Sequence, residues 1–178
     1  MTGWAPTLAA RIAVQREPLR QASLCLLLRG DEVLLARKKR GFGVGKWNGV
    51  GGKPEPGETI DETAIRETEE EIGVTPLGLR RLATLDFFFP ERAEFAGWDQ
   101  QICVYVAERW TGGPIETEEV APRWFAREAI PYAEMWADDP YWLPLVLLGV
   151  SVRGQFLYTD AEHILEYTIM EGPWAESD

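Results

Sequence analysis

The sequence predicts an α+β domain in which helices cover the faces of a mixed β-sheet. Apolar runs of strand length outnumber helical ones, and one clearly amphipathic segment follows a stretch rich in glycine. No repeat or long linker divides the 178 residues, of which 46% are hydrophobic, so one substantial core is expected. We expect the domain at residues 22–172, an N-terminal extension at residues 1–21 and a C-terminal tail at residues 173–178.

The first expected elements are two strands in "ASLCLLLRGDEVLLARKK", residues 22–39. The pair Gly30-Asp31 between two apolar runs is typical of a hairpin turn. The following segment, residues 40–57, has glycine at seven positions, so we expect a loop or an irregular strand there.

Two helices and five further strands are expected downstream. Residues 59–72 predict an amphipathic helix that Gly73 ends. Residues 140–150 predict a second helix, opened by Pro140 and stopped by Gly149. The later strand-like runs are residues 82–89, 101–110, 122–126, 154–159 and 164–170.

The overall charge argues against a nucleic-acid polymer as partner. The chain has 29 acidic and 18 basic side chains, and its formal net charge of -11 repels polyphosphate backbones. No apolar run approaches the roughly 20 residues of a membrane span. We therefore expect a small-molecule substrate and no membrane partner, and we take a monomer as the simplest assembly.

The cysteines and the N-terminal residues bear on cellular location. Cys25 and Cys103 lie inside apolar runs, which favours buried reduced thiols over a disulfide and fits a cytoplasmic protein. The stretch "LAARIAVQREPLR", residues 8–20, bears arginine and few acids, so a transit peptide and an ordinary extension are the alternatives. The ordinary extension is the preferred interpretation.

The helix expected at residues 59–72 carries a concentration of carboxylates. Glu67, Glu70 and Glu71 are spaced i, i+3 and i+4, so they project from one side of the helix. Like charges at this spacing destabilise an isolated helix by about 0.2–0.5 kcal/mol per pair. Oxygen ligands gathered without His or Cys favour Mg²⁺, Mn²⁺ or Ca²⁺. A bare run of glutamates is more often a solvated helix face, so a further signal is needed.

That signal is the spacing of the residues around the glutamates. Gly52, five residues, Glu58, seven residues and then "RETEEEIGV" at residues 66–74 resemble the Nudix box, G-x5-E-x7-R-E-U-x-E-E-x-G-U with U a bulky aliphatic residue. The one departure is Thr68, which is β-branched and close to valine in size. The resemblance implies the Nudix fold, an α/β/α sandwich with a mixed sheet, and hydrolysis of a nucleoside diphosphate linked to another group.

The same resemblance implies a metal site and its ligands. A divalent cation, Mg²⁺ with Mn²⁺ as a substitute, would neutralise phosphate charge and lower the pKa of a bound water. Arg66 is expected to fork onto a carboxylate and orient it, with a purely structural ion pair as the equal alternative. The general base stays open among Glu70, Glu71 and a downstream acid. The implied metal ligands are Glu67, Glu70, Glu71 and a backbone carbonyl near Gly51 or Gly52.

A second resemblance concerns the substrate. The stretches "RKKRGFGVGKWNGVGGK", "MWADDPYW" and "GQFLYTDAEHILEYTIM" are similar to the MutT-homologue branch of the family, whose members hydrolyse 8-oxo-dGTP and 2-hydroxy-dATP. This implies cleavage of oxidised purine nucleoside triphosphates to the monophosphate and pyrophosphate, which removes damaged nucleotides from the precursor pool. The insertion at residues 90–100 and the N-terminal extension depart from that branch.

The branch resemblance also implies a base-binding pocket. Asn48, Asp138 and Asp139 would read the purine edge, with Trp136 beneath the base. Because two adjacent buried aspartates repel, one would hold a proton beside the other's acceptor. Further implied or expected site residues are Phe42 in the pocket, Lys38 on the phosphate side, Glu119 as a metal or base carboxylate, and Phe87 and Phe89 as pocket lining.

Each of these assignments has a structural alternative. The aspartate pair is also typical of a helix N-cap before Pro140. Phe87 and Phe89 are of a type more often found in the core than at a ligand. His163, which precedes an apolar run, is expected to be structural and not catalytic.

Two other functions remain open beside hydrolysis of oxidised purine nucleotides. One is a Nudix hydrolase that acts on a nucleoside diphosphate sugar or a cap-like substrate. The other is a nucleotide-sensing module without turnover, which would be expected to have lost ligand carboxylates. Since the three glutamates of the motif are all present, an enzyme is favoured.

Overall fold

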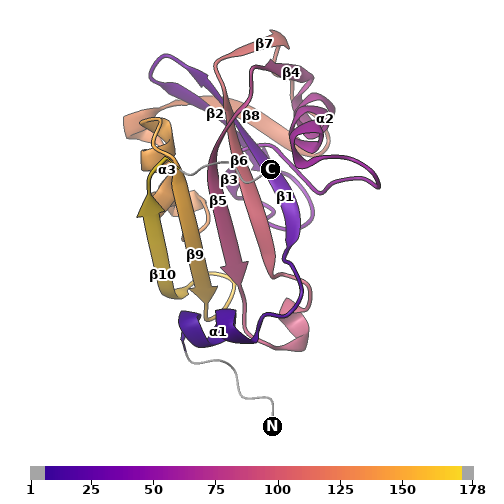
Figure 1. Ribbon diagram of the computed structural model, residues 1–178. Helices are drawn as coiled ribbons and strands as arrows, with labels where there is room; N and C mark the ends of the chain where they lie inside the picture. Colours follow the sequence, from indigo (N-terminus) through magenta and orange to yellow (C-terminus); the bar gives the residue numbers. More distant parts are fainter. Residues whose placement is uncertain (1–6, 174–178) are drawn as a thin grey trace.

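The computed structural model describes residues 7–173 and has the expected mixed sheet with helices on both faces (Figure 1). Its eight-stranded sheet has the order β10-β9-β5-β6-β1-β2-β3, and β8 pairs with β2. The pairs β1–β6 and β5–β9 are parallel. The strands are β1 (Arg20–Arg29), β2 (Glu32–Lys38), β3 (Trp47–Asn48), β5 (Arg80–Phe88), β6 (Gln100–Ala107), β8 (Val120–Ala126), β9 (Val152–Tyr158) and β10 (Ile164–Glu171).

A second small sheet and the helices complete the fold. The small sheet pairs β4 (Val74–Leu77) with β7 (Arg109–Gly112). The α-helices of the described residues are α1 (Leu8–Val14), α2 (Ile60–Ile72) and α3 (Asp139–Leu147), and short 3-10 turns lie at Ala93–Phe95, Arg127–Ala129 and Tyr132–Glu134. None of these helices is long and apolar enough to cross a membrane.

The strand β1 shows why the sheet needs cover on both faces. Leu24 and Leu26 belong to the large core cluster that also holds the buried side chains of α3. Cys25 and Leu27, which point to the opposite face, pack in a second cluster with Ile72 of α2. Because both faces are buried, the strand reads as one continuous apolar run. Figure 1 shows α2 and α3 on opposite sides of the sheet, as an α/β/α sandwich requires.

The hairpin and the buried thiols agree with the sequence-based expectations. β1 and β2 are antiparallel, and Gly30 at their turn has φ 59°, a left-handed conformation that glycine adopts without steric cost. Cys25 and Cys103 are both buried and free. The expectation of reduced thiols in the core is therefore confirmed.

Local signals in the sequence fix both ends of α2. Thr59 accepts from the backbone of Glu62, and Glu62 bonds back to the Thr59 backbone, which forms a capping box. Gly73 ends the helix with φ 71°. Thr68, the departure from the motif, is fully buried, and its hydroxyl donates to the Ala64 carbonyl at 2.7 Å. The hydroxyl is thus satisfied within the helix, and its neighbours can pack closely around it.

Part of the expected N-terminal extension has regular structure. β1 begins at Arg20, slightly before the boundary expected at residue 22, and α1 precedes it. Leu8 of α1 is buried against Phe88 and Leu157. The expected tail at residues 173–178 lies outside the described residues except for Pro173.

Candidate active site

Two carboxylates of α2 and one from the loop before it meet at one arginine. Arg66 forks onto Glu58, with Nε 2.7 Å from Oε1 and Nη2 2.9 Å from Oε2. Its Nη1 donates to Glu67 at 2.9 Å and to Glu70 at 3.1 Å. The guanidinium offsets the repulsion among these carboxylates, and its contact with Glu58 lowers the pKa of that group to about 2.

Glu71 faces away from this arginine and toward a cavity. Its Oε2 accepts from the Gly51 backbone N–H at 3.3 Å, and Lys38 Nζ lies 3.8 Å from its Oε1. Burial raises the pKa of Glu71 to about 7, against the opposing charge of Lys38. Glu71 is therefore a partly buried carboxylate whose charge the protein compensates only in part.

Two glycines allow the motif loop to approach its neighbours closely. A Cβ at Gly51 would lie 1.9 Å from the Ser23 carbonyl oxygen, and one at Gly52 would lie 2.5 Å from the Glu67 carboxylate. The Gly52 carbonyl also accepts from the Ser23 N–H at 2.8 Å. The carboxylate of Glu67 can thus lie against the loop backbone only because Gly52 has no side chain.

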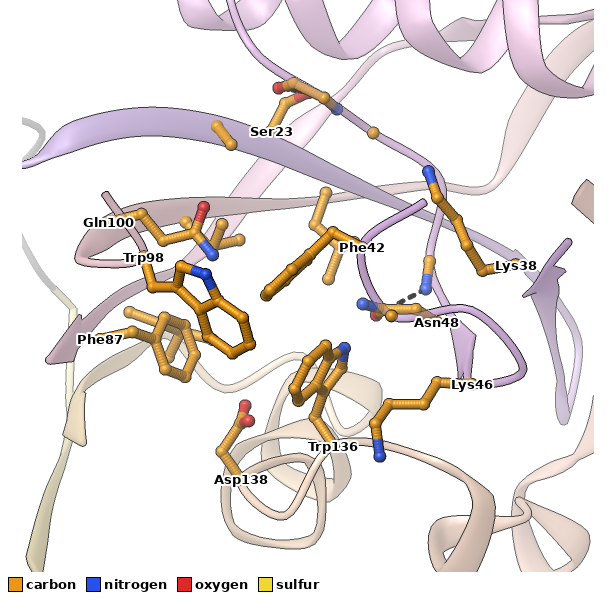
Figure 2. Close-up of a pocket in the computed structure, with 18 of the residues that line it drawn as sticks. Ser23, Lys38, Phe42, Lys46, Asn48, Phe87, Trp98, Gln100, Trp136 and Asp138 are labelled. Atoms are coloured by element: carbon orange, nitrogen blue, oxygen red, sulfur yellow. Dashed lines mark hydrogen bonds between the residues drawn. The ribbon is translucent and has the colours of Figure 1, made fainter. Parts of the chain in front are cut away.

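A cavity of about 570 Å³ extends from Glu71 to the start of α3 (Figure 2). Its walls come from the glycine-rich segment, from β5 and from the segment before α3. Eight residues that the sequence assigns to substrate binding all line it. They are Lys38, Phe42, Asn48, Phe87, Phe89, Trp136, Asp138 and Asp139.

Aromatic rings form the sides of this cavity. Phe42 stacks on Trp136 with centroids 5.1 Å apart and meets Trp98 edge-on at 4.6 Å. Lys46 Nζ also lies 4.9 Å from the centroid of the Trp136 ring. Figure 2 shows Phe42 between the two indoles. Phe42 is 50% exposed, so part of its ring is free to stack on a planar ligand.

Asp138 and Asp139 lie at the base of the cavity with exposures of 5% and 2%. Asp138 Oδ2 accepts from Trp142 Nε1 at 2.8 Å, and its Oδ1 accepts from the Tyr158 hydroxyl at 2.5 Å. Asp138 occupies the N-cap position of α3, but its side chain makes no capping hydrogen bond. The helix-capping alternative therefore does not describe the contacts of its carboxylate.

The two aspartates accept different numbers of hydrogen bonds, and this difference bears on which of them retains a proton. Asp139 accepts one hydrogen bond, from the Trp136 backbone N–H at 2.9 Å. Burial raises the pKa of both carboxyls, and the charge of Asp138 raises the pKa of Asp139 further. The two donors on Asp138 favour its charged form. These contacts favour the charge on Asp138 and retention of a proton on Asp139.

Asn48 contributes a fixed amide to the same cavity. It lies on the short strand β3, which pairs with β2. Its Oδ1 accepts from the Gly49 backbone N–H at 2.8 Å, the bond drawn in Figure 2. Because the oxygen end is held in this way, the amide nitrogen is the end offered to a ligand.

Comparison with known proteins decides the family. Residues 18–146 match the model of the NUDIX domain. The chain belongs to the Nudix family. Oxidized purine nucleoside triphosphate hydrolases from Mus musculus and Danio rerio are 40% and 39% identical to this Nudix protein over 149 residues, which are 84% of this chain and 93% of each relative.

Two further relatives show how far the likeness extends. The crystal structure of a MutT protein from Bacillus halodurans superposes with a TM-score of 0.73 at 27% identity, covering 85% of this chain and 97% of that one. The NAD-capped RNA hydrolase NudC of Chromobacterium violaceum is 35% identical over 113 residues, which are 62% of this chain and 39% of that protein. The expected Nudix fold is therefore confirmed.

The expected metal ligands do not form a closed group in the Nudix protein. Among residues 7–173, no three His, Cys, Asp or Glu side chains are grouped as a metal site. Glu67 and Glu70 contact Arg66, whereas Glu71 points toward Gly51 and the cavity. Arg66 forks onto Glu58 and also contacts Glu67 and Glu70. These contacts fit both roles considered for it, the orientation of a metal ligand and a structural ion pair.

Glu119 lies near Glu71 and Lys38, but its carboxylate is engaged by an arginine. Its carboxylate pairs with Arg40, whose contact and charge lower the pKa of Glu119. Its neighbour Val120 lines the cavity, but Glu119 itself does not. Of the four glutamates expected at the metal, only Glu71 lines the cavity.

The remaining alternatives divide between core and site. Phe87 stacks on Phe156 at 5.3 Å and Phe89 stacks on Tyr158 at 4.9 Å, so both belong to the core while also lining the cavity. His163 is exposed and bonds to Asp160 at 3.0 Å, outside the cavity.

Several lining residues were missed in the sequence. Trp98 lies in the insertion at residues 90–100, where only a departure from the family was noted. Tyr158 and Trp142 were placed on a strand and a helix without a role. For Tyr158 a signal existed, because alternation along β9 puts it on the same face as Phe156. For Lys46, which also lines the cavity, the glycine-rich segment around it has no periodicity that predicts where its side chain points.

Proposed function

We propose that this Nudix protein is a Mg²⁺-dependent pyrophosphohydrolase of oxidised purine nucleoside triphosphates, such as 8-oxo-dGTP and 2-hydroxy-dATP. The observation that carries the proposal is one continuous cavity with Glu71 at one end and the Asp138–Asp139 pair at the other. The names of the mouse and zebrafish relatives support the same substrate class. The products would be the nucleoside monophosphate and pyrophosphate.

The motif glutamates fit a divalent cation. Glu67, Glu70 and Glu71 would hold it, because carboxylate oxygens are the ligands that Mg²⁺ and Mn²⁺ prefer. The raised pKa of Glu71, about 7, fits a carboxylate whose charged form a bound cation would stabilise. When bound, the cation supplies charge neutralisation at the phosphates and an acidified water. Arg66 holds Glu67 and Glu70 in place through its contacts with both.

The polar groups of the cavity would orient the two ends of the nucleotide. Lys38 lies beside Glu71, where its ammonium can attract the phosphates of the substrate. At the other end, Asp138 offers an acceptor and protonated Asp139 offers a donor, while Asn48 offers an N–H. Oxidation changes the order of donors and acceptors on a purine edge. A fixed donor-acceptor pair can therefore favour an oxidised base over a normal one.

The aromatic walls supply affinity that does not depend on the order of donors and acceptors. Stacking a base on an aromatic side chain contributes roughly 1–3 kcal/mol. Trp136, Phe42 and Trp98 are placed to give such contacts on the sides of the cavity. Removing them would weaken binding of all purine nucleotides together.

A substrate panel with Mg²⁺ tests the proposal and its alternatives. The panel contains 8-oxo-dGTP, 2-hydroxy-dATP, dGTP, a nucleoside diphosphate sugar and a capped dinucleotide, and the products are identified by chromatography. We expect kcat/KM to be highest for an oxidised purine triphosphate, with pyrophosphate released. A preference for the sugar or the cap would replace the proposed substrate, and binding without any turnover would indicate a sensing module.

We extend the proposal to the setting in which the enzyme works. The buried free thiols Cys25 and Cys103 suit a reducing cytoplasm, and a monomer is the simplest assembly. Light scattering on the purified protein measures the second point, and a mass near twice the 20.1 kDa of the chain would contradict it.

A further inference from the structure

The helix α1 lies before residues 18–146, the part of the chain that matches the family model, and its Arg11 pairs with the loop between β5 and β6, whose Phe89 and Trp98 line the cavity. We propose that α1 braces the wall of this cavity, with Arg11 as a positioning residue that holds Trp98 through Asp99. The inference rests on the proposed function only in taking the cavity as the binding place of the base.

The docking of α1 is built from buried contacts. Leu8 is 2% exposed and packs with Phe88 and Leu157. Its backbone N–H donates to Glu166 Oε2 at 2.7 Å, which ties the start of the helix to β10. Arg11 is only 6% exposed, and its guanidinium lies 5.2 Å from the centroid of Phe88. An arginine this deeply buried is uncommon unless it is paired.

The partner of Arg11 is Asp99. Their side chains form an ion pair, and Arg11 Nη1 also donates to Gln15 at 3.0 Å. The second oxygen of Asp99 accepts from the Phe89 backbone N–H at 2.8 Å. One carboxylate therefore joins α1 to both ends of the loop between β5 and β6, because Phe89 starts that loop and Asp99 ends it.

This loop carries a wall of the cavity. Trp98, the residue before Asp99, contacts Phe89 at 5.2 Å and meets Phe42 edge-on at 4.6 Å. Phe95 supports the indole from behind at 5.1 Å. Figure 2 shows the Trp98 ring next to Phe42 in the cavity wall. Since Trp98 and Asp99 are adjacent in the chain, a shift of the Asp99 carboxylate moves the indole.

The brace should therefore affect binding of the nucleotide and not the chemical step. The brace acts on the cavity wall formed by Trp98, whereas the motif glutamates lie on α2, where Glu71 is the one among them that lines the cavity. Loss of the ion pair would loosen one aromatic wall and leave the carboxylates of α2 in place. It should raise KM for the nucleotide and leave kcat nearly unchanged, the pattern of lost uniform binding.

Two substitutions test the brace from opposite sides. Arg11→Met keeps a long aliphatic stem over Phe88 and removes the charge, and Asp99→Asn keeps an acceptor for the Phe89 N–H. We expect each to raise KM for 8-oxo-dGTP about tenfold, the size of one stacking contact, with kcat within about twofold. The double variant should be no worse than either single one, because both remove the same interaction. Arg11→Lys should restore part of the affinity.

The matched control is Arg29→Met. Arg29 also pairs with a carboxylate, Glu32 at 2.8 Å, and also covers a ring, Trp124 at 4.1 Å, but it lines no part of the cavity. Its KM should equal that of the wild type. Thermal melts of all variants show whether each is folded at the assay temperature. If Arg11→Met is unfolded at that temperature, the KM values of Asp99→Asn and Arg11→Lys test the brace instead.

The outcomes separate the brace from the proposed function. If the wild type prefers a different nucleotide, the proposed substrate fails, and the brace is then judged by KM for the nucleotide that the wild type does hydrolyse. Wild-type KM in folded Arg11→Met and Asp99→Asn would overturn the brace. A fall in kcat at constant KM, or an equal effect of Arg29→Met, would overturn it as well.

Discussion

The Tyr158 hydroxyl donates to Oδ1 of Asp138 at 2.5 Å, from a strand twenty residues further along the chain. Trp142 donates to the other oxygen of the same carboxylate at 2.8 Å. With both oxygens accepting, the charge of the pair is favoured on Asp138 and the proton on Asp139, whose pKa is raised by burial and by the charge of Asp138. The cavity therefore presents a preferred order of acceptor and donor to a base.

Removal of the Tyr158 hydroxyl should relax this order. In Tyr158→Phe, Asp138 loses one donor, so the proton can lie on either aspartate. We expect the ratio of kcat/KM for 8-oxo-dGTP to that for 2-hydroxy-dATP to move toward one by about tenfold, the worth of a base-edge hydrogen-bond pair. Tyr105→Phe is the control, because Tyr105 is also a buried tyrosine whose hydroxyl donates to a carboxylate, that of Asp61, but it lines no part of the cavity. An unchanged ratio in Tyr158→Phe would remove Tyr158 from base selection.

The protonated Asp139 should be visible in the pH dependence of stability. Below about pH 4 its carboxyl is protonated in both the folded and the unfolded protein. As pH rises, the unfolded chain loses this proton first, so the free energy of unfolding falls until the folded pKa is passed. Each unit by which the folded pKa is raised costs about 1.4 kcal/mol above that point.

The variant Asp139→Asn removes this titration and keeps an N–H donor at the same place. We expect the Tm of the variant, relative to that of the wild type, to increase as pH rises from about 4.5 to about 8. Melting curves over this range check the prediction. Parallel pH profiles for the two proteins would mean that Asp139 is ionised in the folded state.

The motif glutamates should be needed for turnover and not for folding. Glu70→Gln and Glu71→Gln each remove a charge without changing side-chain size, and we expect kcat to fall at least about a hundredfold. Glu69→Gln is the matched control, since Glu69 lies on the same helix and is exposed on another side. Near-wild-type turnover of either test variant in excess Mg²⁺ would refute its assignment as a ligand.

Glu119 gives a prediction whose outcome is informative either way. If its carboxylate leaves Arg40 and joins the metal site during turnover, Glu119→Gln should raise the Mg²⁺ concentration needed for half-maximal rate, while KM for the nucleotide changes little. Arg40→Gln would then lower that concentration, because the carboxylate is released. Identical Mg²⁺ titrations for wild type and Glu119→Gln would leave Glu119 with only its ion pair.

The sequence predicted the parts of the molecule that local signals determine. The capping box at Thr59, the stop at Gly73 and the hairpin at Gly30 are written within a few neighbouring residues. The motif spacing likewise predicted that Glu67 and Glu70 lie together, whereas Glu71 turns toward Gly51 and Lys38. Its resemblance to a known family supplied the eight cavity residues, which are scattered over the chain and which no periodicity brings together.

Contacts between distant residues could not be predicted in this way. Arg11 and Asp99 are 88 positions apart, and Tyr158 and Asp138 lie on different elements. Their pairing depends on how the ends of β5, β9 and α1 meet in space. Glu119 shows the converse, because its sequence match to a metal carboxylate gives no information about the competing Arg40 beside it.

The central claim is that this cavity reads an oxidised purine through the carboxylate of Asp138. The most direct measurement is the ratio of kcat/KM for 8-oxo-dGTP over dGTP, from competition of the two nucleotides, in the wild type and in Asp138→Asn with both folded by thermal melt. We predict a wild-type ratio well above one and a change of about tenfold or more in the variant. A wild-type ratio near one, or the same ratio in both proteins, would contradict the claim and leave only the Nudix chemistry of α2.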